Sequence, residues 1–278
     1  MPYTCHLFSR QRKKKRRSEP FREQRAMRSV YNRFWEIDAL RGVAIILMVL
    51  FHFIYDLTFF DVLRIDLWSG PVFYIGRSAA ILFIFLVGVS LTLSHSRNKV
   101  SGSQVSFKKY LKRGFHIFFW GLVFTIGSWL LFPDEVIVFG ILHFIGIAIV
   151  LSYPLLGYRL LNLIGGFMVL FLGKLMENFT VDFPWLVWLG LTPPDFQTLD
   201  YFPLFPWFGV TMLGIFTGNM LYPDYRRKYK LLDLSHNPLI SALEFMGRKS
   251  LAIYVVHQPL LVFLLYVFGV VDLHSTGI

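Results

Sequence analysis

Seven long apolar runs constrain this chain more than any other feature of its sequence. Each is near the roughly 20 residues that an α-helix needs to cross a bilayer. They lie at about 37–60, 71–93, 113–132, 136–156, 158–176, 203–222 and 250–271. Only 16% of the residues are charged, whereas a soluble domain has about 25%. We therefore predict an all-α integral membrane protein, a polytopic bundle of about seven transmembrane helices.

Lysine and arginine are distributed very unevenly between the segments that join these runs. The segments 1–35, 94–113, 157–159 and 223–249 hold 24 of the 28 basic residues. Alternate connections of a membrane protein lie on the same side, and cytoplasmic connections are the ones enriched in basic residues. We expect the N-terminus in the cytoplasm and the C-terminus outside. The membrane that the protein crosses is expected to be the plasma membrane of the cell.

Residues 1–33 form a basic segment that contains the uninterrupted basic run 12–17 and lacks the apolar stretch of a signal peptide. We interpret it as a disordered cytoplasmic tail attracted to anionic lipid, with a nuclear address as the alternative. Met27 is an alternative start of the chain. After this tail, one transmembrane domain is expected to cover 34–278. The net charge of +11 is concentrated in this tail and between apolar runs, so we expect membrane lipids as partners and no nucleic acid.

The first apolar run carries four ionisable residues. They are Asp38, Arg41, His52 and Asp56. Asp or Arg at the bilayer centre costs roughly 2.5–3.5 kcal/mol. At about 100° per residue, all four side chains fall within an arc of about 60° on one helix face, and Arg41 and His52 are about 16 Å apart along the axis. This polar stripe must face the interior of the bundle or a water-filled cavity.

The residue types in the stripe suggest group transfer. Arg41, with Asp38 beside it, is a candidate for binding the phosphate or carboxylate of a long anionic donor that enters from the cytosol. His52 can take a proton from an attacking hydroxyl or amine, and Asp56 could orient its imidazole. The structural alternative is an arginine that extends to the headgroups and a histidine in the packed interior. Four groups on one face favour the functional interpretation.

Three further residues are candidates for binding an acceptor. Arg77 enters the second helix at roughly the depth of His52, where it could pair with Asp56, bind an acceptor or extend to the headgroups. Asp200 lies at the outer mouth beside two prolines, where it could bind an acceptor amine or hydroxyl, with a solvated loop aspartate as the alternative. His257 lies within the last helix, where it lines a cavity or contributes to packing. We find no Cys/His pattern typical of a metal site and expect no metal.

Several stretches of the chain resemble a known family of membrane enzymes. Leu40-Arg41-Gly42-Val43-Ala44, with His52 eleven positions after Arg41, resembles the Arg-x10-His signature of the transmembrane acyltransferase superfamily. The wider match covers EIDALRG at 36–42, FIFLVGVS at 83–90, DYFPLFPWFG at 200–209 and GRKSLAIYVVHQP at 247–259. Together these stretches resemble the heparan-α-glucosaminide N-acetyltransferase catalytic-domain family, from about residue 33 onward.

The resemblance implies acetyl-CoA as the acyl donor and a sugar amine or hydroxyl on the outer side as the acceptor. By position, Arg41 would help to hold the donor and His52 would be the catalytic base. In the lysosomal branch of the family the catalytic histidine lies in the loop after the first helix, but residues 53–76 contain no histidine. His52 therefore follows the broader superfamily, and the acceptor of the lysosomal enzymes does not carry over.

The function predicted from the sequence is acyl transfer from cytosolic acetyl-CoA to an extracytoplasmic saccharide or glycolipid. His52 either deprotonates the acceptor or carries the acyl group transiently, and the sequence leaves both routes open. The alternative is a secondary transporter in which the polar stripe acts as a relay. A non-catalytic membrane scaffold is a third possibility, which would tolerate apolar residues in place of the stripe.

Overall fold

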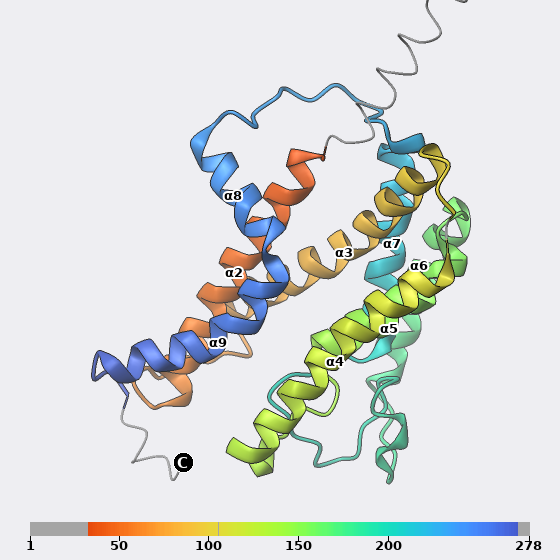
Figure 1. The fold of residues 1–278 in the computed structure, drawn as a ribbon. Coiled ribbons are helices and arrows are strands. Elements are labelled where there is room, and N and C mark those ends of the chain that lie inside the picture. The colour runs from red at the N-terminus through yellow and green to blue at the C-terminus, as the bar shows by residue number, and fades with distance from the viewer. Residues whose placement is uncertain (1–32, 105, 272–278) are drawn as a thin grey trace, which may run out of the picture.

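The computed structural model describes residues 33–104 and 106–271. Nearly all of the basic tail that we predicted at 1–33 thus lies outside the described residues, and its disorder remains a prediction. The regular structure within the described ranges consists of helices (Figure 1). The α-helices are α2 (Trp35–Phe59), α3 (Gly70–Val100), α4 (Phe107–Leu131), α5 (Ile141–Ser152), α6 (Arg159–Met176), α7 (Leu204–Leu221), α8 (Pro238–Arg248) and α9 (Ser250–Val267).

Each apolar run of the sequence forms a helix, because lipid offers no hydrogen-bond partner to an open backbone. Six of the described helices, α2, α3, α4, α6, α7 and α9, are long and apolar enough to cross a membrane. The prediction of an all-α integral membrane bundle of about seven helices is confirmed. Seven crossings would put the two ends of the described chain on opposite sides, while the N-inside orientation stays a prediction.

The fourth predicted crossing is made by a shorter helix than we expected. The α-helical part of α5 has 12 residues and continues in a 3₁₀ turn, Tyr153–Leu155. The backbone N–H of Ile141 donates to Asp200, just before α7, and the carbonyl of Leu156 accepts from Asn219, near the end of α7. Residues 141–156 therefore run along the whole of α7. Most of α5 is buried among other helices, so it need not match the hydrocarbon thickness alone.

The helices form two groups with α3 between them (Figure 1). Helices α2, α8 and α9 pack together, as do α4 with α5 and α6 with α7, and α3 contacts both α2 and α7. The α3–α7 contact is close because it is made of glycines. A Cβ added to Gly88 would fall on the carbonyl of Thr211, and one added to Gly214 would fall on the carbonyl of Phe85. Small residues at such seams let two backbones approach each other within the membrane.

Helix α8 was not predicted, because we assigned 223–249 to a cytoplasmic connection between helices. The side chain of Asn237 accepts the Leu239 N–H at 2.9 Å, and Pro238 occupies the first helical position. These are recognisable signals of a helix start. Helix α8 lies against α2 in a second glycine contact, where a Cβ on Gly42 would meet the carbonyl of Leu243.

The α3–α7 seam gives a prediction about stability. In Gly214→Val the added carbons meet the backbone of Phe85, which cannot rotate away, so we expect a loss of about 1–3 kcal/mol, typical of overpacking. Gly127→Val is the matched control, because no atom lies within 4 Å of a Cβ there. Tryptophan fluorescence during thermal unfolding in detergent should show a lower melting temperature for Gly214→Val alone. Equal melting temperatures for the two variants would contradict this packing.

Candidate functional site

A cavity of about 560 Å³ lies between the two groups of helices. Its walls come from α2, α3, α4, α5 and the junction of α8 with α9. Basic side chains gather at the ends of these helices on the predicted cytoplasmic side. They are Arg33, Arg41, Arg97, Arg113 and Arg248. Asp38 is the one acidic residue among the described lining residues, so the cavity wall is strongly positive.

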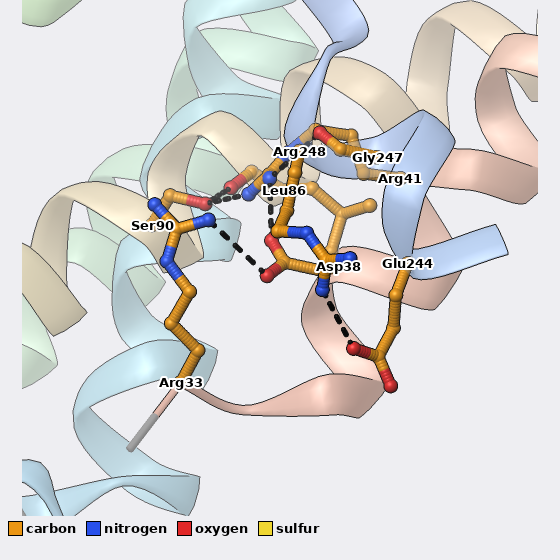
Figure 2. Close-up of polar contacts among 8 residues, drawn as sticks. All are labelled: Arg33, Asp38, Arg41, Leu86, Ser90, Glu244, Gly247 and Arg248. Carbon is orange, nitrogen blue, oxygen red and sulfur yellow. Dashed lines mark hydrogen bonds and ion pairs between the residues drawn. The ribbon is translucent and has the colours of Figure 1, made fainter. Parts of the chain in front are cut away.

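Arg41 is held in place by hydrogen bonds to three different helices (Figure 2). One terminal nitrogen, Nη1, donates to Asp38 Oδ1 at 2.8 Å on its own helix and to the carbonyl of Gly247 at 3.2 Å on α8. The other, Nη2, donates to Ser90 Oγ at 2.7 Å on α3, and Ser90 in turn donates to the carbonyl of Leu86. The guanidinium is therefore fixed in orientation while it lines the cavity.

Asp38 is buried, and two arginines offset its charge. Besides Arg41, Arg33 Nη1 lies 3.7 Å from Asp38 Oδ2. A carboxylate in this position repels a phosphate, so its role towards an anionic donor is to orient Arg41. Arg41 and Asp38, the two residues that we predicted for the donor site, are thus in contact. Arg41 is the cation, and Asp38 holds it in position.

Two polar side chains at the cavity were not singled out as candidates from the sequence. Ser90 is one of several small polar residues within an apolar run, and Arg97 is one of the basic residues that we assigned to the cytoplasmic side. Arg113 and Arg248 likewise belong to the basic segments that we assigned to the cytoplasmic side. The cavity brings these arginines together with Arg41, a clustering that helix ends far apart in sequence do not reveal.

Apolar side chains line the cavity beyond the arginines, and two histidines lie behind this wall without lining the cavity. Phe83, Leu142 and Ile145 are among these lining residues, together with Tyr254. The Tyr254 ring lies 5.3 Å from that of His257, and the His257 ring lies 4.8 Å from that of His52, edge to face. The cavity thus leads from Arg41 to Tyr254, and two ring contacts connect Tyr254 to His52.

Both histidines have the same hydrogen-bond arrangement. His52 Nδ1 lies 2.9 Å from the carbonyl of Met48, and His257 Nδ1 lies 2.6 Å from the carbonyl of Tyr254. A carbonyl can only accept, so each Nδ1 carries the hydrogen and each Nε2 of a neutral ring has a free lone pair. No described residue pairs with the buried His257 Nε2. Each histidine therefore presents the atom that a general base or a nucleophile uses.

Asp56 is buried one helical turn after His52, but its hydrogen bond goes to a different residue. Gln258 Nε2 donates to Asp56 Oδ1, and Met48 has the orienting role towards His52 that we expected of Asp56. Asp56 Oδ2 and Gln258 Oε1 have no partner within the described ranges. Gln258 was not a candidate from the sequence, because only the packing of α9 on α2 shows that it reaches Asp56.

Arg77 and Asp200 each have a partner outside the histidine pair. The Arg77 guanidinium lies 4.6 Å from the ring centre of Trp207, a cation–π contact. Asp200 Oδ2 accepts the N–H of Ile141 at 2.9 Å and so caps α5. Burial raises the pKa of the Asp200 carboxyl to about 6, although this hydrogen bond acts in the opposite direction. Asp200 also lies within electrostatic range of the Tyr254 hydroxyl.

His143 also has a structural role. Its Nδ1 accepts the backbone N–H of Gly140 at 3.2 Å, and its Nε2 lies 3.4 Å from Thr125 Oγ1. It therefore closes the start of α5 and ties that helix to α4. Within the described ranges no group of three or more His, Cys, Asp or Glu side chains could hold a metal ion.

Comparison with known proteins gives one match. The family described as "Heparan-alpha-glucosaminide N-acetyltransferase, catalytic" matches residues 33–259. The match covers the cavity and both histidines. No curated protein and no solved structure matches the chain.

The geometry around Arg41 gives a prediction about charge pairing. Arg41→Met leaves Asp38 without its closest cation, and breaking a buried pair in this way costs about 3–5 kcal/mol. The double variant Arg41→Met/Asp38→Asn removes the stranded charge, so it should be more stable than Arg41→Met. Thermal unfolding in detergent measures both. A double variant less stable than Arg41→Met would show that the pair does not act in this way.

Asp200 gives a prediction about pH. A carboxyl whose pKa is raised on folding holds its proton longer in the folded protein. Its contribution to stability is complete below its ordinary pKa and is lost as the pH rises through about 6. Relative to Asp200→Asn, which cannot ionise but still accepts a hydrogen bond, the wild-type melting temperature should fall between about pH 4 and about pH 7. A constant difference over that range would contradict the raised pKa.

Proposed function

The chain belongs to the heparan-α-glucosaminide N-acetyltransferase catalytic-domain family, and from this premise we propose that it transfers an acetyl group across a membrane. The donor is cytosolic acetyl-CoA and the acceptor is an amine or hydroxyl of an extracytoplasmic saccharide or glycolipid. The plasma membrane is the proposed location. The observation that carries this proposal is the positive cavity that extends from Arg41 to Tyr254, which two ring contacts connect to His52.

The charged and apolar parts of the cavity wall follow one another in the same order as the charged and apolar parts of the donor. Acetyl-CoA carries its phosphates at one end, an uncharged arm in the middle and the thioester at the other end. Arginines such as Arg41 and Arg113 suit the phosphates, because a guanidinium binds them through two N–H groups. The apolar wall at Phe83 and Ile145 suits the arm. The thioester would then lie beyond it, near Tyr254 and the histidines.

His52 has the chemical form that the reaction requires. Its Nε2 lone pair can take the proton of the acceptor as the new C–O or C–N bond forms and the C–S bond breaks. The same lone pair could instead attack the thioester and hold the acetyl group until the acceptor arrives. Met48 orients the ring in both routes. Asp56 supports this end of the site as a buried carboxylate one turn away.

Three further residues are proposed to bind substrate: His257 where donor and acceptor meet, and Arg77 and Asp200 on the acceptor side. The ring contact of His257 with His52 makes it the best supported of the three. Arg77 and Asp200 would act further out, through their contacts with Trp207 and α5. Neither the described residues nor the family match supports the alternative of a secondary transporter.

The role of His52 is tested in membranes supplied with labelled acetyl-CoA. His52→Ala removes the base, so transfer of label to endogenous acceptors should fall by about 10²–10⁴-fold, the usual contribution of acid–base catalysis. His236→Ala is the control, because His236 is exposed in the loop before α8. Undiminished transfer by His52→Ala would refute the assignment.

A second prediction concerns the donor phosphates. Arg113→Gln should raise the KM for acetyl-CoA about tenfold with little change in kcat, because the lost contact is equally strong in the ground state and the transition state. Lys112→Gln is its neighbour and control, since Lys112 is exposed and does not line the cavity. The KM values from initial rates decide. Equal KM values for the two variants would place the phosphates elsewhere.

A further inference from the structure

The contact between His52 and His257 joins two helices that are far apart in the sequence. His52 belongs to α2 and His257 to α9, and their rings meet edge to face at 4.8 Å with an interplanar angle of 81°. Each uses its Nδ1 on a backbone carbonyl of its own helix. Neither Nε2 atom is therefore used to hold the two rings in place.

The unpaired Nε2 of His257 is costly for a residue that serves packing alone. Leaving a buried polar atom without a partner costs about 1–3 kcal/mol, and His257 Nε2 is such an atom among the described residues. Asp56 Oδ2, one turn beyond His52, is another. Unpaired polar atoms that gather at one place within a membrane helix bundle are typical of a reaction site.

Acetyl transfer from a thioester requires two proton movements. The acceptor hydroxyl or amine loses a proton, and the sulfur of the departing CoA gains one. Each histidine is positioned to serve one of these two proton movements, because the ring contacts run in the order Tyr254, His257, His52. Tyr254 lines the donor cavity, so His257 is on the side of the sulfur and His52 is on the far side.

We propose that His257 is a second catalytic residue, the general acid that protonates the CoA sulfur while His52 takes the proton of the acceptor. The inference rests on the proposed function. Both rings begin neutral, each with its Nδ1 hydrogen on a backbone carbonyl and its Nε2 lone pair free. As the acceptor oxygen or nitrogen bonds to the acetyl carbon, its proton passes to His52 Nε2. The C–S bond breaks and its electron pair stays on sulfur. The proton passes from His52 Nε2 to His257 Nε2, which donates it to the sulfur.

The proton that the acceptor loses is thus the one that the sulfur gains across the ring contact, so atoms and charge balance over one turnover and both rings return to the neutral form. Asp56 lies one turn beyond His52 on α2. Gln258 fixes its carboxylate through Oδ1 and leaves Oδ2 unpaired. Groups that interact this closely titrate as a pair.

The test uses two donors that differ in their leaving group. One is acetyl-CoA, whose thiolate needs a proton. The other is the acetyl thioester of 4-nitrothiophenol, whose stabilised thiolate leaves without one. Both carry a labelled acetyl group, and transfer to endogenous acceptors is measured in native membranes for wild type, His257→Asn and His52→Asn. In each variant the Asn amide nitrogen can replace Nδ1 in the bond to the backbone carbonyl, while Nε2 is lost.

With acetyl-CoA, both variants should lose about 10²–10³-fold of the wild-type rate, as expected for the loss of an acid or a base. With the aryl thioester, His257→Asn should return to within about tenfold of wild type, whereas His52→Asn should stay low. A merely structural role of His257 would lower both rates alike. Binding of CoA to the detergent-solubilised variants, measured by calorimetry, should be unchanged because the phosphates bind at the arginines.

Three results would overturn the proposal. The first is an equal loss with both donors in His257→Asn, the second is a wild-type rate in that variant with acetyl-CoA, and the third is a loss of CoA binding. A wild-type protein that transfers no acetyl group from acetyl-CoA would refute the proposed function itself, and this role of His257 with it. The two failures are therefore distinguishable.

Discussion

A guanidinium near the start of a membrane helix needs acceptors from the protein, and the way Arg41 obtains them organises this structure. Its hydrogen bonds reach Asp38 on α2, Ser90 on α3 and the carbonyl of Gly247 on α8. A charge in apolar surroundings is stable only when it is paired in this way. The same bonds hold the wall of the cavity, so one interaction serves both the fold and the site.

The position of α8 follows from that arrangement and determines where α9 begins. Gly42 and Gly247 let the two backbones approach, since a Cβ on Gly247 would meet the carbonyl of Asp38. The chain then turns into α9, which lies along α2 and brings His257 to His52 and Gln258 to Asp56. A cavity that starts among arginines thus leads towards two histidines, with Tyr254 next to them.

The membrane bundle and the polar stripe could be predicted because they depend on local properties. Hydropathy and length identify the crossings, and the helical period places Arg41 and His52 on one face. Contacts between helices could not be predicted in this way. The bond between Gln258 and Asp56, the capping of α5 by Asp200 and the stacking of Arg77 on Trp207 each join distant parts of the chain. Helix α8 was missed for a different reason, because it is short and lies in a segment that we classified by its charge.

The central claim is that one continuous path connects the arginines to the histidine pair and that acetyl-CoA occupies it. A cryo-EM structure of the protein with a non-hydrolysable acetyl-CoA analogue tests this most directly. The account predicts density with the phosphates at Arg41 and Arg113, and with the acetyl end beside His257 and His52. Donor density outside the cavity, or an acetyl group on the far side of Tyr254 from the histidines, would contradict it.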